Sequence, residues 1–483
     1  MPLIIPANSA SASGYAIDNS CRFNDGSSDY LNKSNGTPTN ADRCTISCWV
    51  KRGNLVEGMI LGNYSSASFR ARFGFDSNHK LEYNQVNDGS VTCAVTTNMV
   101  FRDTSAWYHI VCAVDTTDGT ASNRIKIYVN GTQVDVTFAT NIDQNLDFKL
   151  NQASVPLVVG QDGNNAKYFD GYQSETVFID GTQNAVTDFG EFDEDSGIWK
   201  PIDGLADLTF GTNGFYLDFE DSAALGDDVS GNGNDFTVNN LTAIDQTTDT
   251  PTNNFATWNP LVHYSTSATF SEGNLKVTPQ ENTSRVYTVS TIAMPTVSGS
   301  KWYAEFKLLA NDNVGIVGIL DAAQTSFVFH NNSDLDNQNG DTSVGRVTYR
   351  VGNGLIKYPS GQSVDTTVTT TNGQTVMIAL DSGNGKVWFG KDGTWFNSGD
   401  PGADSGGVDF TGQSWWTSGV DAFVFLVGDG STGGYDNWSA NFGNPPYTIS
   451  SGNADGNSRG NFEYSVPSGF LSLCTKNLSE ILS

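Results

Sequence analysis

Short runs of apolar and β-branched residues that alternate with polar ones recur along most of the chain, and they constrain its fold more than any other feature. Between residues 44 and 161 the runs CTISCWVKR, GMILGNY, SFRARFGFD, KLEYNQV, VTCAVTT, WYHIVCAVD, RIKIYVNGTQVDV and LVVGQ follow one another. A two-residue period places successive side chains on opposite faces of a strand, whereas a helix needs apolar residues three or four apart. The spacing therefore predicts an antiparallel β-sandwich.

The Asn130-Gly131 pair gives the strongest local turn prediction, because a type I′ hairpin needs positive φ at both of its central residues. A second set of strand-like runs follows residue 261 and includes KWYAEFKLL, VGIVGIL, SFVFH, VGRVTYRV, QTVMIALD and DAFVFLVG. These runs predict a second antiparallel sandwich.

Between the two sets the composition changes to acids and turn-forming residues, and only FYLDF and DFTV resemble strands. The sequence therefore predicts five parts: an N-terminal docking segment (1–15), a sandwich (16–185), an acidic, loop-rich connector (186–260), a second sandwich (261–449) and a C-terminal tail (450–483) with one short helix near its end. The fold class predicted is all-β, with two antiparallel β-sandwich domains of jelly-roll type joined by the connector. The apolar start Pro2-Leu3-Ile4-Ile5-Pro6 is too short to bury its own surface, so we expect it to dock on a partner chain.

The charge of the chain excludes two classes of partner. Its 25 basic and 53 acidic residues give a formal net charge of −28. That field repels phosphate backbones and anionic lipid, so we expect no nucleic-acid partner. Nor does any stretch approach the roughly 20 apolar residues of a membrane span. Only 16% of residues are charged while 11% are aromatic, which indicates a folded chain with a surface of uncharged polar residues.

The six cysteines are Cys21, Cys44, Cys48, Cys93, Cys112 and Cys474. Those in TISCWV and WYHIVCAVD alternate with Ile and Val, which is typical of small core residues. We predict reduced, buried thiols and assembly in a reducing cytoplasm.

Catalytic motifs are missing from the sequence, which contains no GxSxG, HExxH or Walker loop. The four histidines, His79, His109, His263 and His330, are isolated from one another, and His109 alternates outward in its strand. The acidic run that contains Glu191 and Asp193 resembles a solvated face more than a glycosidase pair. We predict that the protein is not an enzyme, with a polysaccharide depolymerase as the least favoured alternative.

A calcium site is one interpretation of the connector. Asp227, Asp228, Asn232, Asn234 and Asp235 lie within nine residues, with Gly231 and Gly233 between them. Calcium takes six to eight oxygen ligands, which carboxylate and amide side chains supply. The alternative, which we favour, is an Asx/Gly turn held by side-chain-to-backbone hydrogen bonds.

Aromatic residues near predicted strand ends are candidates for stacking on a sugar ring, which has an apolar face and polar edges. They are Trp107, Tyr108, Trp395, Trp415, Trp416, Tyr435 and Trp438. Core packing is the competing interpretation for a tryptophan inside a strand.

Several motifs resemble known families. CTISCWVKRGN, WYHIVCAVDTTDG, RIKIYVNGTQV and FDGYQSETVFIDG resemble a laminin-G-like, concanavalin A-type lectin sandwich. KWYAEFKL, VGIVGIL, NGKVWFGKDGTWFNSGDP and NFGNPPY resemble a SPRY domain. The whole arrangement, with its joining motifs FGEFDEDSGIWKP and DTPTNNFATWNPL, is similar to structural proteins of tailed bacteriophages.

The phage resemblance implies a virion protein exposed on the particle surface after assembly in the host cytoplasm. It implies a tail fibre or adhesion fibre whose two lectin-like domains recognise a host-surface glycan, in contact with other virion proteins and as a homo-oligomer. The alternative is a capsid decoration or tail adaptor protein that makes protein contacts only. The chain shows no coiled coil or β-helix that would form a long shaft.

Overall fold

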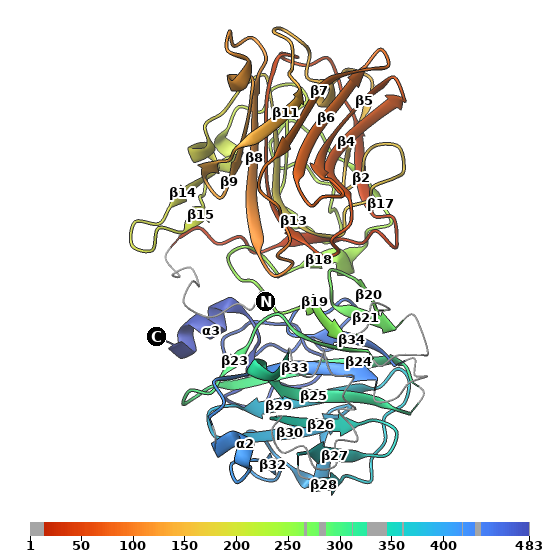
Figure 1. Cartoon of the computed structure of the whole chain (residues 1–483), viewed down its shortest axis with the longest axis vertical. Coiled ribbons are helices and arrows are strands. Elements are labelled where there is room, and N and C mark those ends of the chain that lie inside the picture. Colours follow the sequence, from red (N-terminus) through yellow and green to blue (C-terminus); the bar gives the residue numbers. More distant parts are fainter. Residues whose placement is uncertain are drawn as a thin grey trace. The chain divides into compact units, whose positions relative to one another are not determined.

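The computed structural model describes residues 14–264, 268–279, 286–311, 313–325, 345–359, 362–417, 419–429 and 436–482. It divides into two compact units, which we call the first unit (Ala10–Asn253) and the second unit (Asn254–Ser483), both drawn in Figure 1. The predicted strand SFVFH, Tyr435 and residues 1–13 of the predicted docking segment lie outside the described residues.

The first unit consists of two eight-stranded sheets and a small hairpin. Sheet one has the order β10 (Thr132–Gln133), β9 (Ile125–Val129), β8 (Trp107–Asp115), β3 (Arg43–Arg52), β13 (Gly171–Asp180), β1 (Ser20–Phe23) and β18 (Gln246–Thr247), with β16 (Phe215–Leu217) also paired to β13. Sheet two has the order β11 (Val136–Thr140), β7 (Ser90–Thr97), β6 (Leu81–Asn87), β5 (Phe69–Phe75), β4 (Gly58–Ser66), β12 (Pro156–Val159), β2 (Tyr30–Ser34) and β17 (Thr237–Asn239). The hairpin pairs β14 (Gly190–Phe192) with β15 (Trp199–Pro201).

The alternation seen in the sequence builds the core of this sandwich. Cys44, Ile46 and Cys48 on β3 and Cys112 on β8 face the same buried cluster as the inward side chains of sheet two. All six cysteines are buried and free, which confirms the predicted core thiols. The Asn130-Gly131 hairpin is also confirmed, with φ of 47° and 77° between β9 and β10.

The predicted connector is not a separate part. Residues up to Asn253 belong to the first unit, where β16 and β18 extend sheet one and β17 extends sheet two. The chain had few strand-like runs in this region because these strands are only two or three residues long. Their positions are fixed by partners far away in the sequence, which local patterning does not reveal.

The β14–β15 hairpin covers part of the outer face of sheet one. There Trp199 donates its indole N–H to Nδ1 of His109 at 2.9 Å, and Nε2 of His109 lies 2.9 Å from the Ser47 hydroxyl. His109 does point away from the main core, as its alternation indicated, but it is buried beneath Trp199. Burial lowers the pKa of His109 to about 3, so this imidazole is neutral and serves packing.

The second unit also has two sheets. One has the order β19 (Trp258–Tyr264), β22 (Tyr287–Ser290), β33 (Ala422–Asp429), β25 (Gly315–Asp321), β26 (Arg346–Arg350), β27 (Leu355–Tyr358) and β28 (Gln362–Asp365), with β23 (Met294–Pro295) paired to β33. The other has the order β20 (Ala268–Ser271), β21 (Lys276–Pro279), β34 (Asn437–Asn441), β24 (Lys301–Ala310), β29 (Thr375–Asp381), β30 (Lys386–Lys391) and β31 (Thr394–Trp395), with β32 (Val408–Asp409) and β35 (Leu471–Ser472) paired to β30 and β24. Two antiparallel sandwiches thus confirm the predicted all-β fold class.

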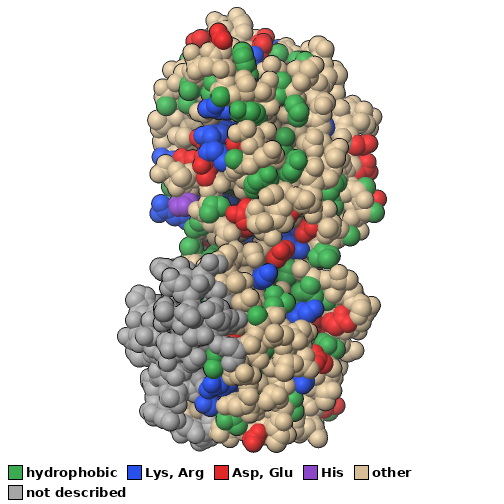
Figure 2. Space-filling view, turned by 90° about the vertical axis from the view of Figure 1, so that its right-hand side faces the viewer, with side chains coloured by type: hydrophobic (Ala, Val, Ile, Leu, Met, Phe, Trp, Pro, Cys, Tyr) green, Lys and Arg blue, Asp and Glu red, His purple; other side chains and the backbone are tan. Residues whose placement is uncertain are grey.

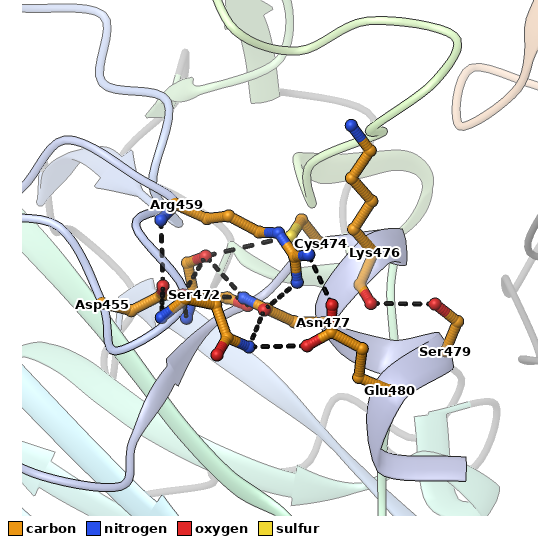
Figure 3. Close-up of polar contacts among 9 residues, drawn as sticks. Asp455, Arg459, Ser472, Cys474, Lys476, Asn477, Ser479 and Glu480 are labelled. Atoms are coloured by element: carbon orange, nitrogen blue, oxygen red, sulfur yellow. Dashed lines mark hydrogen bonds and ion pairs between the residues drawn. The ribbon is translucent and has the colours of Figure 1, made fainter. Parts of the chain in front are cut away.

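The C-terminal tail is folded against the second unit and ends in the predicted helix, α3 (Thr475–Leu482). Figure 3 shows the polar contacts that hold this helix. Asp455 accepts hydrogen bonds from the Ser472 backbone N–H and from Nδ2 of Asn477, at 2.8 and 2.7 Å. Arg459 forms an ion pair with Glu480 on the helix. Elsewhere α2 (Ser414–Thr417) is a single turn, and within the described residues no helix has the length and apolar character to cross a membrane.

Candidate functional site

A cleft of about 300 Å³ opens at one end of the first unit, between the loop after β2 and the loop before β12. Its lining combines apolar and polar side chains from two short segments: Pro38, Ala41, Asp147, Phe148, Lys149, Asn151, Gln152 and Ala153. Small-molecule sites have volumes of roughly 300–1,000 Å³ and usually carry an apolar lining with a few polar groups. The cleft therefore has the size and composition of a site for one or two small polar rings.

The apolar part of the cleft rests on the core. Phe148 is buried and stacks on Tyr83, with ring centroids 4.4 Å apart. The backbone N–H of Phe148 donates to the carbonyl of Ala41 at 2.7 Å, which joins the two loops directly. The floor of the cleft is therefore held by packing and by backbone pairing together.

One carboxylate, at the end of β13, fixes both loops. Asp180 is buried and accepts hydrogen bonds from the Thr39 N–H at 2.8 Å and from Nδ2 of Asn151 at 2.7 Å. It also accepts from the N–H of Asn213 at 3.0 Å. Asn213 comes from the predicted connector, so that segment helps to shape the cleft.

The exposed part of the cleft is polar and mixed in charge. The ammonium of Lys149 lies 3.6 Å from a carboxylate oxygen of Asp147, whose side chain is exposed. Gln152 is half-buried beside them. These side chains offer hydrogen-bond donors and acceptors at the rim, while the Phe148 ring closes the base.

A second polar surface lies on the outer face of sheet two. Arg72 on β5 forms ion pairs with Glu82 on β6 at 2.8 Å and with Glu57 at 3.9 Å, and Glu57 also pairs with Lys167. Figure 2 shows basic and acidic side chains side by side on the first unit, within a surface that is mostly neither charged nor hydrophobic. Because these charged side chains pair with one another, fewer of their donors and acceptors are left for a ligand than in the cleft.

The aromatic residues predicted to bind sugar do not form one site. Trp107 and Tyr108 are neighbours on β8 and therefore face opposite sides of sheet one; Tyr108 packs on Phe101. The Trp107 indole N–H donates to Asp249 at 3.0 Å, which directs its polar edge inward. The other four described candidates, Trp395, Trp415, Trp416 and Trp438, belong to the second unit.

Two of those four tryptophans are core residues, which corrects the prediction for them. Trp438 on β34 has no exposed surface and Trp415 is buried against Phe410, so neither presents a face to a ligand. Their strand and helix positions point into the sandwich core, where burial of a large ring is most favourable. Trp416 and Trp395 are half-buried and pack on Phe423 and Tyr303.

The predicted calcium ligands form the alternative structure, a hydrogen-bonded turn. Both oxygens of Asp228 are occupied: Oδ1 accepts from the N–H of Tyr216 and Ser230, and Oδ2 from the N–H of Asn234. Oδ1 of Asp235 accepts from the Asp228 N–H at 3.1 Å.

The remaining predicted ligands point elsewhere. Asn232 and Asn234 donate their amide groups to the carbonyls of Gly211, Thr212 and Gly214, and Asp227 is exposed. Across the described part of the chain, no group of three or more His, Cys, Asp or Glu side chains is arranged to hold a metal ion. These contacts form the favoured structure, an Asx/Gly turn held by side-chain-to-backbone hydrogen bonds, and through Tyr216 the loop anchors β16.

Sequence reasoning missed the cleft residues because nothing in their local pattern distinguishes them. The segments TPTNA and DFKLNQA contain ordinary loop residues. They meet only when β2 pairs with β12 in sheet two and the sheet that contains β13 packs beside them. The one available signal was the mixture of Phe148 with the flanking Asp147 and Lys149 in a turn-rich segment. That mixture is common in loops and is not specific.

Comparison with known proteins identifies the class of the first unit. Residues 25–185 match the model of the concanavalin A-like lectin/glucanases superfamily, so this region has a concanavalin A-like fold. No curated protein sequence matches the chain.

Among solved structures, the SPRY domain of human HERC1 is similar at 13% identity and a TM-score of 0.28, over 38% of this chain and 96% of that one. A SAP-like pentraxin from Limulus polyphemus is similar at 16% identity and 0.28, over 35% and 78%. The CBM40 of the Ruminococcus gnavus IT-sialidase, bound to α2,3 sialyllactose, is similar at 15% identity and 0.22, over 29% and 87%.

Proposed function

We propose that this protein is a carbohydrate-binding virion protein of a tailed bacteriophage, and that it holds a host-surface glycan in the cleft between residues 38–41 and 147–153. The observation that carries the proposal is that this cleft lies in the unit whose residues 25–185 match the concanavalin A-like lectin/glucanases model. The lining suits a sugar, since it combines the apolar side chains of Pro38, Ala41 and Ala153 with a polar rim. The rim residues are Asp147, Lys149 and Gln152.

Binding rather than hydrolysis is favoured by the carboxylates of the cleft. Glycosidases use two carboxyl groups that flank the scissile bond. Among the lining residues only Asp147 carries a carboxylate, and it is exposed beside Lys149. The protein in this proposal is therefore a lectin and not a depolymerase.

The virion part of the proposal rests on the sequence similarity to tailed-phage structural proteins. In this proposal the protein lies on the particle surface, as a tail or adhesion fibre component in contact with other virion proteins. Labelled antibody against the chain should decorate intact particles, at the tail for a fibre and over the head for a decoration protein. Particles that carry no label and lack the chain would contradict the proposal.

Glycan binding is tested with the purified full chain on an array of bacterial surface polysaccharides, followed by calorimetry on the best glycan. Lys149→Ala and Gln152→Ala should each weaken binding roughly tenfold, because one hydrogen bond to a ligand contributes about 1.4 kcal/mol. Gln133→Ala on the exposed edge strand β10 is the matched control and should bind as the parent does.

Two results would count against the site or the function. Equal loss of binding in Gln152→Ala and Gln133→Ala would move the site away from the cleft. Release of reducing sugar from a bound polysaccharide would make the protein a depolymerase, and the absence of binding to any glycan would favour the protein-contact alternative.

A further inference from the structure

Lys51 and Asp249 lie in direct contact in the interior of the first unit, 198 residues apart in the chain. Nζ of Lys51 is 2.8 Å from Oδ2 of Asp249, and their side chains are 1% and 0% exposed. The ammonium also lies 5.4 Å from the centre of the Tyr172 ring. By comparison, in the Lys301–Asp381 pair of the second unit the lysine is 27% exposed and the oxygen is 3.2 Å away.

A buried lysine–aspartate pair brings an amine nitrogen, which can act as a nucleophile, next to the carboxyl carbon that it can attack. Burial makes two opposite charges expensive, because each ion loses its hydration. Joining the two groups as a neutral amide would remove both buried charges. An unprotonated lysine amine is the reactive form in nucleophilic chemistry.

We propose that Lys51 and Asp249 join covalently through an isopeptide bond. Nζ attacks Cγ of Asp249, the new C–N bond forms, and the C–Oδ2 bond breaks. Two of the three ammonium hydrogens leave with that oxygen as one molecule of water, and the third remains on the amide nitrogen. No atom is oxidised or reduced, so the reaction needs no co-reactant.

The surrounding residues favour this reaction. The indole N–H of Trp107 donates to Oδ1 of Asp249 at 3.0 Å, on the oxygen where negative charge develops during attack. The Ser20 hydroxyl donates to the Asp249 carbonyl at 2.6 Å, and the Asp249 N–H donates to Thr247 at 3.2 Å. Lys51 is held within β3, between β8 and β13. Two reactive groups fixed at contact distance react as one molecule, with a high effective concentration.

The bond also has a structural consequence. Asp249 lies four residues before Asn253, where the first unit ends, and the neighbouring strand β18 has only two residues. A covalent link from Asp249 to the middle of sheet one would keep this end of the unit attached when the chain is pulled from the second unit. Fraying from this end of the unit would then stop at Asp249 and leave β18 in place.

The test is the intact mass of the full chain, purified and fully denatured before measurement. The parent protein should be lighter than its sequence by the mass of one water molecule, and a protease digest should contain one peptide pair joined through Lys51 and Asp249. Lys51→Arg keeps the positive charge but removes the amine, so it should show its full sequence mass. Lys301→Arg, the matched control, should retain the loss of water.

The denatured parent should also migrate faster than Lys51→Arg in a denaturing gel, because its chain contains a closed loop. If the parent has its full sequence mass and Lys51 is recovered in an unlinked peptide, the proposal is wrong. That measurement needs no variant, so it decides the question even if Lys51→Arg does not fold.

Discussion

The segment that closes the first unit, residues 186–253, is fastened through several separate buried carboxylates, whereas the tail that closes the second unit, residues 450–482, depends mainly on two. In the first unit Asp180 binds Asn213, Asp245 forms an ion pair with Arg22, and Asp249 forms one with Lys51. In the second unit Asp455 holds α3 and β35, and Glu305 holds residues 463 and 464. Two sandwiches of the same architecture are therefore completed by different distributions of polar contacts.

In the second unit, Glu305 alone makes many of the polar contacts that attach the tail. It is fully buried on β24 and accepts hydrogen bonds from the Tyr303 hydroxyl, from Nδ2 of Asn441 and from the N–H groups of Glu463 and Tyr464, at 2.8 to 3.2 Å. Loss of this one side chain would remove the acceptor of four donors, of which the Tyr303 hydroxyl and Nδ2 of Asn441 belong to buried residues. In the first unit the attachment of residues 186–253 is shared among several carboxylates, so loss of any one of them should release less of that segment.

The largest effect is therefore expected for Glu305→Ala. Unpaired buried donors cost about 1–3 kcal/mol each, and partial relaxation should leave a net loss of about 3–5 kcal/mol in the free energy of unfolding of the second unit. Limited proteolysis should cut the tail first. Asp421→Ala, at an exposed acid of the same unit, is the control. If the two variants are equally stable, Glu305 is not a main attachment of the tail and the proposed difference between the units is wrong.

The pH dependence of the first unit should come next in size. Glu175 lies on a β-bulge of β13, buried, with φ of 48°, and accepts a hydrogen bond from the Tyr216 hydroxyl. Burial, with the nearby acids Asp218 and Glu220, raises the pKa of Glu175 from 4.5 to about 7.

The folded state therefore keeps a proton on Glu175 that the unfolded chain has already lost between these two pH values. Stability should fall as pH rises from 4.5 to 7, by up to about 3 kcal/mol. Glu175→Gln, which stays neutral and keeps an acceptor oxygen, should flatten this part of the stability–pH curve in urea unfolding. A curve unchanged by the substitution would show that Glu175 does not carry the dependence.

Asp228→Ala tests how much the turn at residues 228–235 stabilises the first unit by holding β16. It tests the calcium interpretation at the same time. Loss of the Asp228 side chain removes three acceptor contacts that neighbouring groups and water partly replace, so we expect a cost of about 2 kcal/mol. Thermal melts in calcium and in chelator should superimpose for the parent and for the variant. A calcium-dependent shift in the parent that Asp228→Ala abolishes would restore the metal site.

The smallest effect is expected at the Arg459–Glu480 pair of the tail, which Figure 3 shows together with Asp455. The Glu480 side chain is 50% exposed, and exposed ion pairs contribute below about 1 kcal/mol. A double-mutant cycle with Arg459→Ala and Glu480→Ala should return a coupling energy in that range. A coupling of several kcal/mol would place the tail's anchor here and not at Glu305.

Local patterns were sufficient wherever the relevant neighbours are close in sequence. Alternation predicted the strands that carry Cys44, Cys48 and Cys112 and the burial of those thiols. The Asn130-Gly131 pair predicted its hairpin because positive φ at two successive residues is a property of those residues themselves. The same reasoning failed for Trp415 and Trp438, since which face of an element is buried depends on what packs against it.

The sequence by itself therefore determined the all-β class, the two sandwiches, the buried thiols and the helix near the end of the chain. Only the tertiary structure decided that residues 186–253 complete the first sandwich, that Asp228 accepts hydrogen bonds from backbone N–H groups, and that segments 38–41 and 147–153 form a cleft. It also brought Lys51 to Asp249 across 198 residues. The physical reason is that strand alternation and turn conformation are set by neighbouring residues, whereas the partner of a buried polar group is chosen by sheet pairing between distant parts of the chain.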